Sequence, residues 1–441
     1  MKYAFLNAAL LDGNLDAEGN MPLRKNAAIF VTNDVITGVY VGKHPDTAGY
    51  RVIDLEDKYV LPGLINLHSH FVPAMPVCKP KPGKETKKLD LTTLKQKLTG
   101  IKLVDAIIGV VLKGVARDMV CSGVTTVRTV GGINDADAKM RNRIQAGKVS
   151  GPRMLVANTA ISVPGGHMAG LLATEATCPA DAVRDVREIA KTDPNLIKLM
   201  VTGGVLDATE TGEPGALKMA PEIVKAACDE AHALGYCVAA HTESAEGVKV
   251  ALQNGVDTIE HGAKPDEEML NLFKARSAAD ICTLSPALPY VYMDAAETGL
   301  GQLGQHNGTI VFKGIVECAK ACLENGIPVG LGTDTGCPFI TPYDMWRELV
   351  YFVRFCGVTP AFALHTATKV NAEILGIGDR TGTIEVGKSA DFIVAKNNPL
   401  EDFENLRNLS MVCVQGKLIR KPKVKRIKSI DKALDSVMTK I

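Results

Sequence analysis

The chain has 441 residues, of which 46% are hydrophobic and 22% charged, and it contains 41 glycines. This composition can bury a large core and is not that of a disordered or collagen-like chain. The 50 Lys and Arg residues nearly balance the 49 Asp and Glu residues, for a formal net charge of +1, so no overall field attracts nucleic acid or an anionic membrane. We therefore expect a small-molecule substrate, no nucleic-acid partner and no membrane partner.

The 11 cysteines are odd in number and include no Cys-x-x-Cys pair, which favours a reducing compartment over a disulfide framework. Cys318 and Cys322 fall on one face of a predicted helix, where we expect small core residues rather than metal ligands. The start of the chain lacks a signal-peptide pattern, and no run reaches about 18 apolar residues. The sequence therefore predicts a cytoplasmic protein.

Both ends of the chain contain short strand-like runs separated by Asp, Asn and Gly turns, without a helical period. Because these β segments flank a different middle part, we expect them to form one small β-sandwich from residues 1–60 and 379–425. A C-terminal tail or helix is expected at 426–441. The basic segment 420–428 that leads into it is predicted to be solvated, and the lysine-rich stretch 79–90 to be an exposed loop.

The middle part, residues 61–378, alternates apolar strand-sized runs with longer helical patterns, as repeated βα units do. Continuous apolar strands suit a parallel sheet that is covered on both faces, and eight of them with intervening helices predict a closed (β/α)8 barrel. The fold class is thus α/β, a TIM-like barrel with a small β-sandwich built from both termini. The expected barrel strands are 61–67, 123–128, 152–157, 196–202, 236–241, 256–261, 279–284 and 328–334.

Polar residues mark the C-terminal ends of these strands, where barrel enzymes place their catalytic groups. His68 and His70 end the first strand and point the same way, because side chains alternate along an extended segment. His241, His261 and Asp334 end the fifth, sixth and eighth strands. Each has an ordinary alternative, as a hydrogen-bonded histidine or a helix-capping aspartate. Together they supply the nitrogen and oxygen ligands that zinc prefers.

Lys198 lies between apolar residues of the fourth strand, where a lysine is seldom buried without a partner. It could form a salt bridge or reach out of the barrel top. Alternatively, its amine, made neutral by burial, could add carbon dioxide to give a carbamate that bridges two metal ions.

These residues and their motifs resemble the amidohydrolase superfamily, in particular its branch of prolidase-like and imidazolonepropionase-related enzymes. The resemblance covers nearly the whole chain. The matching motifs, in order, are LPGLINLHSH (61–70), GVTTVR (123–128), LIKLMVTGGV (196–205), VAAHTES (238–244), TIEHGA (258–263), GLGTDTG (330–336) and TGTIEVGKSADFIV (381–394).

The resemblance implies a site with two divalent metal ions, for which zinc is expected. One ion would be held by His68, His70 and Asp334, the other by His241 and His261, and carboxylated Lys198 would bridge them. In the implied mechanism a metal-bridging hydroxide attacks the amide carbonyl, and Asp334 passes its proton to the leaving amine.

Two further residues are candidates for catalysis or substrate binding. His167, on the loop after the third strand, matches a histidine-bearing loop of this branch and would donate to the substrate carbonyl or bind the substrate, unless it caps a turn. Arg128, at the end of the second strand, would bind a substrate carboxylate, unless it bridges a nearby acidic residue. Asn66 and Thr129 depart from the pattern of the family, but neither is a ligand, so they bear on ligand orientation and substrate choice.

The predicted activity is hydrolysis of the C–N amide bond of a dipeptide, such as Xaa-Pro, or of an N-acyl amino acid, by a homo-oligomer. One alternative is hydrolysis of a cyclic amide, as by imidazolonepropionase, although enzymes of that kind often use one metal and lack the bridging lysine. A second alternative is a non-catalytic scaffold that keeps the barrel for oligomer contacts.

Overall fold

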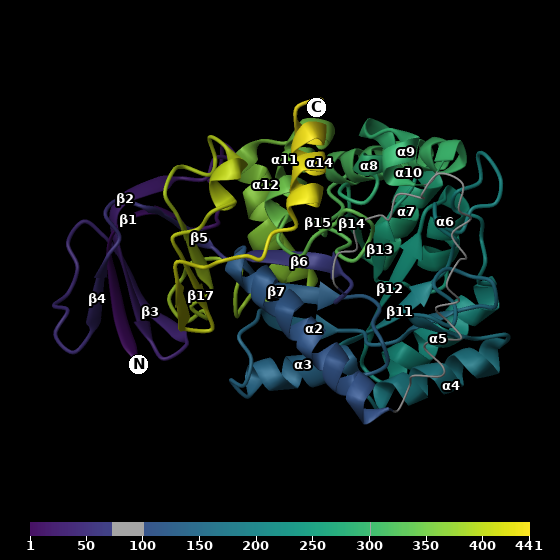
Figure 1. Ribbon diagram of the computed structural model, residues 1–441, viewed down its shortest axis with the longest axis horizontal. Coiled ribbons are helices and arrows are strands. Elements are labelled where there is room, and N and C mark those ends of the chain that lie inside the picture. The colour runs from purple at the N-terminus through teal and green to yellow at the C-terminus, as the bar shows by residue number, and fades with distance from the viewer. Residues whose placement is uncertain (73–100, 300) are drawn as a thin grey trace.

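The computed structural model describes residues 1–72, 101–299 and 301–441 (Figure 1). The expected lysine-rich loop at 79–90 lies outside these residues. In the described part, a mixed sheet built from the two ends of the chain lies at one side of the molecule, and two parallel sheets with their helices lie at the other (Figure 1). The side chains of the predicted site come from the parallel sheets.

The mixed sheet joins the two ends of the chain. Its strands are β1 (Lys2–Leu11), β2 (Leu23–Thr32), β3 (Val35–Val41), β4 (Arg51–Asp54), β5 (Tyr59–Pro62), β16 (Phe392–Ala395), β17 (Met411–Val414) and β18 (Lys417–Arg420). They follow the order β18-β17-β16-β5-β1-β2-β3, with β4 beside β1. The terminal segments meet where β16 pairs antiparallel with β5, Val394 opposite Val60.

This sheet corrects one detail of the expected sandwich. β5 pairs with β16 on one edge and with β1 on the other, so the terminal strands form one continuous hydrogen-bonded sheet rather than two separate facing sheets. Its apolar side chains, such as Phe5, Ile29 and Phe392, pack on one another, and the rings of Phe5 and Phe392 meet edge to face at 5.0 Å. The sheet therefore has a core of its own.

All eight strands expected between residues 61 and 334 are present. A three-stranded parallel sheet contains β6 (Leu64–Ser69), β7 (Val124–Thr129) and β8 (Arg153–Val156). The other five are β11 (Leu196–Met200), β12 (Cys237–Thr242), β13 (Thr258–His261), β14 (Ala279–Cys282) and β15 (Val329–Leu331). They form a second parallel sheet, which two short strands extend, β9 (Ala160–Ser162) and β10 (Ala173–Glu175).

Backbone hydrogen bonds connect the two parallel sheets at both of their edges. Where β6 meets β15, the amide of Asp334 donates to the carbonyl of His68 at 2.8 Å. Where β8 meets the start of β11, the amide of Asn195 donates to the carbonyl of Val156 at 2.7 Å. The C-terminal ends of strands from both sheets therefore lie together.

Helices cover the outer faces of the parallel sheets (Figure 1), and apolar residues fill the space between them. The helices are α2 (Lys102–Cys121), α3 (Ala136–Gln145), α4 (Pro179–Ala190), α5 (Pro221–Ala233), α6 (Ala245–Gln253), α7 (Glu267–Arg276), α8 (Leu288–Tyr292), α9 (Ala295–Thr298), α10 (Gly301–Glu324), α11 (Met345–Cys356), α12 (Pro360–His365) and α13 (Asn371–Ile374). A π-helical turn spans Thr366–Val370, and a 3-10 turn spans Phe403–Leu406.

The C-terminal segment ends in a helix, α14 (Lys428–Met438). Ile430 and Leu434 of this helix pack against Phe339 and Ile340. The basic segment before it was expected to be solvated. This expectation needs a correction, because the Arg426 guanidinium lies 5.3 Å from the centre of the Tyr343 ring. Helix α14 and its basic approach are therefore docked on the body of the protein.

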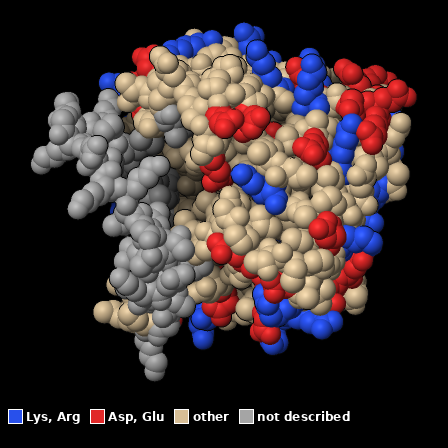
Figure 2. Space-filling model, turned by 90° about the vertical axis from the view of Figure 1, so that its right-hand side faces the viewer, with Lys and Arg blue, Asp and Glu red and all other residues tan. Residues whose placement is uncertain are grey.

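In the described part of the chain, no helix combines the length and the apolar character needed to cross a bilayer. The ten described cysteines are free thiols. Acidic and basic side chains are interspersed over the face in Figure 2, in keeping with the small net charge.

Candidate active site

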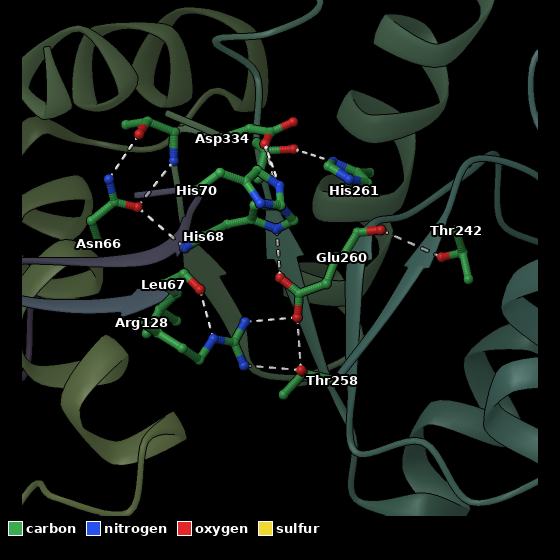
Figure 3. Close-up of polar contacts among 12 residues, drawn as sticks. Asn66, Leu67, His68, His70, Arg128, Thr242, Thr258, Glu260, His261 and Asp334 are labelled. Atoms are coloured by element: carbon green, nitrogen blue, oxygen red, sulfur yellow. Dashed lines mark hydrogen bonds and ion pairs between the residues drawn. The ribbon is translucent and has the colours of Figure 1, made fainter. Parts of the chain in front are cut away.

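The first predicted ligands lie at the C-terminal end of β6. His68 is buried, with Nδ1 2.7 Å from an oxygen of Glu260 and Nε2 3.4 Å from Asp334 Oδ1 (Figure 3). His70 donates from Nδ1 to the carbonyl of Gly131 at 2.9 Å and has Nε2 3.3 Å from the same Asp334 oxygen. Because an acceptor occupies Nδ1 of each ring, Nε2 is the nitrogen left to bind a metal.

Asp334 follows β15 with a φ of 54°, a left-handed conformation that aspartate adopts more readily than most residues. Burial raises the pKa of Asp334, but the charges and hydrogen bonds of His68 and His70 outweigh burial and hold it well below its usual value. Burial lowers the pKa of His70, whereas contact with Asp334 raises it above its usual value overall. One ligand atom from each residue lies within 4.8 Å of the other two, so the three can share one ion.

The helix-capping alternative for Asp334 does not fit the fold. The next helix, α11, begins at Met345 and has Asp344 at the position before it. Asp334 instead accepts a hydrogen bond from Cys337 at 3.2 Å through its second oxygen. Its carboxylate thus belongs to the histidine cluster.

A second cluster forms at the ends of β12 and β13. His241 Nε2 lies 3.2 Å from the carbonyl of Gly203, and His261 Nδ1 lies 2.7 Å from the hydroxyl of Thr283. Burial holds the pKa of both histidines well below the usual value, which keeps the imidazoles neutral as metal binding requires. The His261 ring centre lies 4.7 Å from those of both His68 and His241, so the two clusters adjoin.

Lys198 is buried in β11, and its Nζ has no hydrogen-bond partner among the described residues. The structure therefore contains neither the salt bridge nor the solvent-reaching lysine considered above. Burial lowers the pKa of Lys198 to about 8, because loss of water disfavours the charged form by more than the charges of Glu260 and Asp334 favour it. A buried amine without a hydrogen-bond partner is unusual in a folded protein, which marks Lys198 as a candidate functional residue.

Arg128 forms the bridge to an acidic residue that was the alternative to binding a substrate carboxylate. Its guanidinium donates to the carbonyl of Leu67 at 2.6 Å, to the hydroxyl of Thr258 at 3.0 Å and to Glu260 at 2.6 Å (Figure 3). Glu260 in turn accepts from His68. All three guanidinium nitrogens are thus engaged inside the fold, and Arg128 orients the His68 ring through Glu260.

His167 does come to the site. Its Nδ1 hydrogen bonds to the carboxylate of Asp207, and its ring lies parallel to that of His241, 4.2 Å away at an interplanar angle of 4°. A small cavity of about 50 Å³ is lined by His167 together with His241, His261 and Asp334. His167 is therefore placed to contact a substrate bound beside the ligands.

Three acidic residues at the site escaped the sequence analysis. Glu260 lies in β13 directly before His261 and could have been found as Lys198 was, as a charged residue inside an apolar strand. Glu243 lies beside His241 and His261 with one oxygen within 4.8 Å of their nitrogens, and burial raises its pKa to about 8. Asp207 lies on a loop, where no periodic signal reveals its contact with His167.

Asn66, one of the departures from the family pattern, supports the same site. Its side-chain amide donates to the hydroxyl of Thr333 at 2.7 Å, and its oxygen accepts from the Thr333 amide at 3.1 Å. Asparagine can make both bonds at once because it carries a donor and an acceptor. It thereby fixes the end of β6 against β15.

The model of the amidohydrolase family matches residues 59–419. This chain belongs to the amidohydrolase family. The resemblance inferred from the motifs is thus confirmed, and the chain is a hydrolase of amidohydrolase type with a fold like that of the TIM barrels.

Among solved structures, a putative prolidase from Bifidobacterium longum is 35% identical, with 99% of each chain covered and a TM-score of 0.85. A Xaa-Pro dipeptidase with bound methionine in its active site is 28% identical over 95% of this chain and 100% of that one, with a TM-score of 0.79. Among curated proteins, ochratoxinase from Aspergillus niger is 25% identical, covering 91% of this chain and 84% of the relative. The structural neighbours are therefore prolidase-like amidohydrolases.

Proposed function

We propose that this amidohydrolase cleaves the C–N amide bond of a dipeptide, such as Xaa-Pro, or of an N-acyl amino acid, and that it uses two divalent metal ions. The observation that carries the proposal is the pair of adjoining candidate ligand clusters at the end of the parallel strands, near a buried lysine whose amine has no hydrogen-bond partner among the described residues. The likeness to a putative prolidase and to a Xaa-Pro dipeptidase supports the choice of substrate.

The proposal includes a closed (β/α)8 barrel of residues 61–378. The backbone hydrogen bonds that join the two parallel sheets at both edges support it. Residues 1–60 and 379–425 would form the terminal β domain, and 426–441 the C-terminal helix. A cytoplasmic location and a homo-oligomer stay predictions.

The donor set fits two divalent ions. His68, His70 and Asp334 would hold one ion, for which zinc is expected, and His241 and His261 the other. The Lys198 amine would bond to the carbon of carbon dioxide and release a proton, and the resulting carbamate would add an anionic ligand for the ions. When bound, such ions supply Lewis acidity that activates water and polarises the scissile carbonyl.

The remaining steps fall to side chains of this chain. Asp334, held ionised by its two histidines, accepts the proton of the attacking water and donates it to the nitrogen of the leaving amine. His167, beside His241 and next to the cavity, binds the substrate. Glu260 and Arg128 keep the His68 ring oriented.

Metal content and substrate range test the proposal directly. Elemental analysis of the purified protein should give up to two divalent ions per chain, and His68→Ala and His241→Ala should each lower that number. His232→Ala is a matched control, because this histidine pairs with Asp257 at the surface and should leave the metal content unchanged.

The metal-loaded protein is then offered dipeptides, N-acyl amino acids and cyclic amides. Hydrolysis of a linear amide is expected. Cleavage of cyclic amides alone would favour the imidazolonepropionase-like alternative, and the absence of stoichiometric metal under every loading condition would remove the metal-dependent reading in favour of a scaffold.

A further inference from the structure

The loop that follows β11, residues 203–207, packs against two of the imidazoles at the site. The Gly203 carbonyl lies 3.2 Å from His241 Nε2. A Cβ on Gly204 would lie 3.3 Å from His167 Cε1 and 3.3 Å from His241 Nε2, closer than side chains ordinarily pack. The glycine therefore lets the loop backbone reach both rings.

Asp207 ends this loop and holds His167. One Asp207 oxygen accepts from the Gly204 amide at 3.0 Å and from His167 Nδ1. A carboxylate only accepts hydrogen bonds, so this contact places the imidazole proton on Nδ1 and leaves Nε2 as the second nitrogen. The parallel stack on His241 fixes the plane of the same ring.

We propose that Asp207 is a positioning residue, which holds His167 flat against His241 and sets its tautomer so that Nε2, as a hydrogen-bond acceptor, faces an N–H group of the bound substrate. This inference rests on the proposed hydrolysis. The physical basis is that of carboxylate–imidazole pairs in general, in which the acceptor fixes both ring orientation and proton position. Without Asp207, the ring can turn over and offer the wrong nitrogen.

If the Asp207–His167 pair were purely structural, removal of Asp207 would lower stability rather than turnover. The Asp207 side chain is 29% exposed and that of His167 is 16% exposed, and pairs open to solvent contribute little to stability. Removing Asp207 should therefore leave the thermal midpoint close to that of the parent protein. A large kinetic effect would then have to act through His167.

The experiment is a double-mutant cycle with Asp207→Asn, His167→Gln and both changes together, measured as kcat, KM, metal content and thermal midpoint. Asp207→Asn should lower kcat about 10–100-fold, the range for residues that orient a working group. The double variant should be no slower than His167→Gln, because Asp207 has nothing left to position. Glu210→Gln, an exposed carboxylate on the same segment, is the control and should keep full activity.

Additive effects in the cycle, or normal kcat in Asp207→Asn, would overturn the inference while leaving the proposed hydrolysis intact. If the parent protein hydrolyses no amide, the proposed function fails, and the inference is tested by nitrogen NMR of the histidine-labelled protein. Asp207→Asn should then change the His167 tautomer signals, and unchanged signals would refute the positioning role.

Discussion

Buried charged side chains have different hydrogen bonding at the ends of the parallel strands and in the mixed terminal sheet. Asp391, buried just before β16, accepts from Arg153 at 3.0 Å, from Thr381 at 3.1 Å and from the amide of Gln415 at 2.6 Å. Lys198 is equally buried, yet its amine has no hydrogen-bond partner among the described residues. The carboxylate is fully hydrogen-bonded, whereas the amine has only the longer-range attraction of Glu260 and Asp334.

The difference separates a structural group, Asp391, from a candidate functional group, Lys198. A compensated carboxylate ties the terminal sheet to Arg153 of β8 and needs nothing more. An uncompensated amine costs stability unless a bound group or a chemical change satisfies it, and such costs are typical of functional sites. Substitution of Lys198 should therefore mainly change activity, and substitution of Asp391 should mainly change stability.

Replacement of Lys198 should have the largest effect on activity. Lys198→Ala should abolish turnover and weaken the binding of both ions, because the proposed carbamate ligand is lost. A short carboxylic acid added to the solution should restore part of the rate. In the metal-free protein, Lys198→Met should not lower the thermal midpoint, since it removes an amine without a partner.

Turnover, metal content and thermal midpoint of both Lys198 variants check this expectation. A plain, unmodified lysine found by mass spectrometry in the fully loaded, active enzyme would contradict it. The contrast with Asp391 would then have to be explained without a carbamate.

Asp334 should come next. Asp334→Asn keeps the shape and one ligand oxygen but cannot accept the proton of the water, so turnover should fall roughly 10²–10⁴-fold with the fold intact. Turnover, metal content and thermal midpoint are measured on one preparation. Near-normal turnover at normal metal content would remove Asp334 from proton transfer.

Replacement of Asp391 tests the role of the buried carboxylate in the terminal sheet. Asp391→Ala leaves Arg153 largely buried without its partner, which should lower the free energy of unfolding by about 3–5 kcal/mol. The kcat of the folded fraction should stay the same. Urea unfolding and activity per folded molecule provide the measurement, and a loss of kcat without a loss of stability would reverse the roles assigned to the two regions.

The sequence predicts these two regions unequally well. All eight strands from 61 to 334 form because their continuous apolar runs suit burial on both faces, and residues that follow such strands meet at one edge. His68, His241, His261 and Asp334 were therefore brought together as expected.

Features that depend on tertiary partners could not be predicted in the same way. Arg128 allowed two readings until Glu260 was seen beside it, and the pairing of β5 with β16, which makes one sheet from the terminal strands, leaves no local signal. The contact of Asp207 with His167 joins two loops, whose paths follow from packing rather than from a period in the sequence.

The smallest effect is expected for Glu348 of α11, which is intermediate between Asp391 and Lys198. It is buried with hydrogen-bond partners, as Asp391 is, but burial still raises the pKa of its carboxyl group. It accepts from the amides of Leu284 at 2.6 Å and Ser285 at 2.9 Å. Burial raises its pKa to about 7, although these hydrogen bonds lower it. As the pH rises above about 4.3, the unfolded chain ionises first while the folded protein keeps its proton. The contribution of this group to stability is therefore fully present below about pH 4.3 and is lost as the pH approaches 7.

Between pH 5 and pH 8 the change amounts to about 2–3 kcal/mol, because the pH rises by about two units before it reaches the folded pKa and one unit corresponds to about 1.4 kcal/mol. Glu348→Gln cannot ionise, so relative to the parent protein it should gain stability between pH 5 and pH 8, whatever its offset from lost hydrogen bonds. Urea unfolding of both proteins at the two pH values measures this gain. A difference that does not change with pH would mean that Glu348 titrates normally in the fold, and that its hydrogen bonds compensate the buried carboxylate as completely as the partners of Asp391 do.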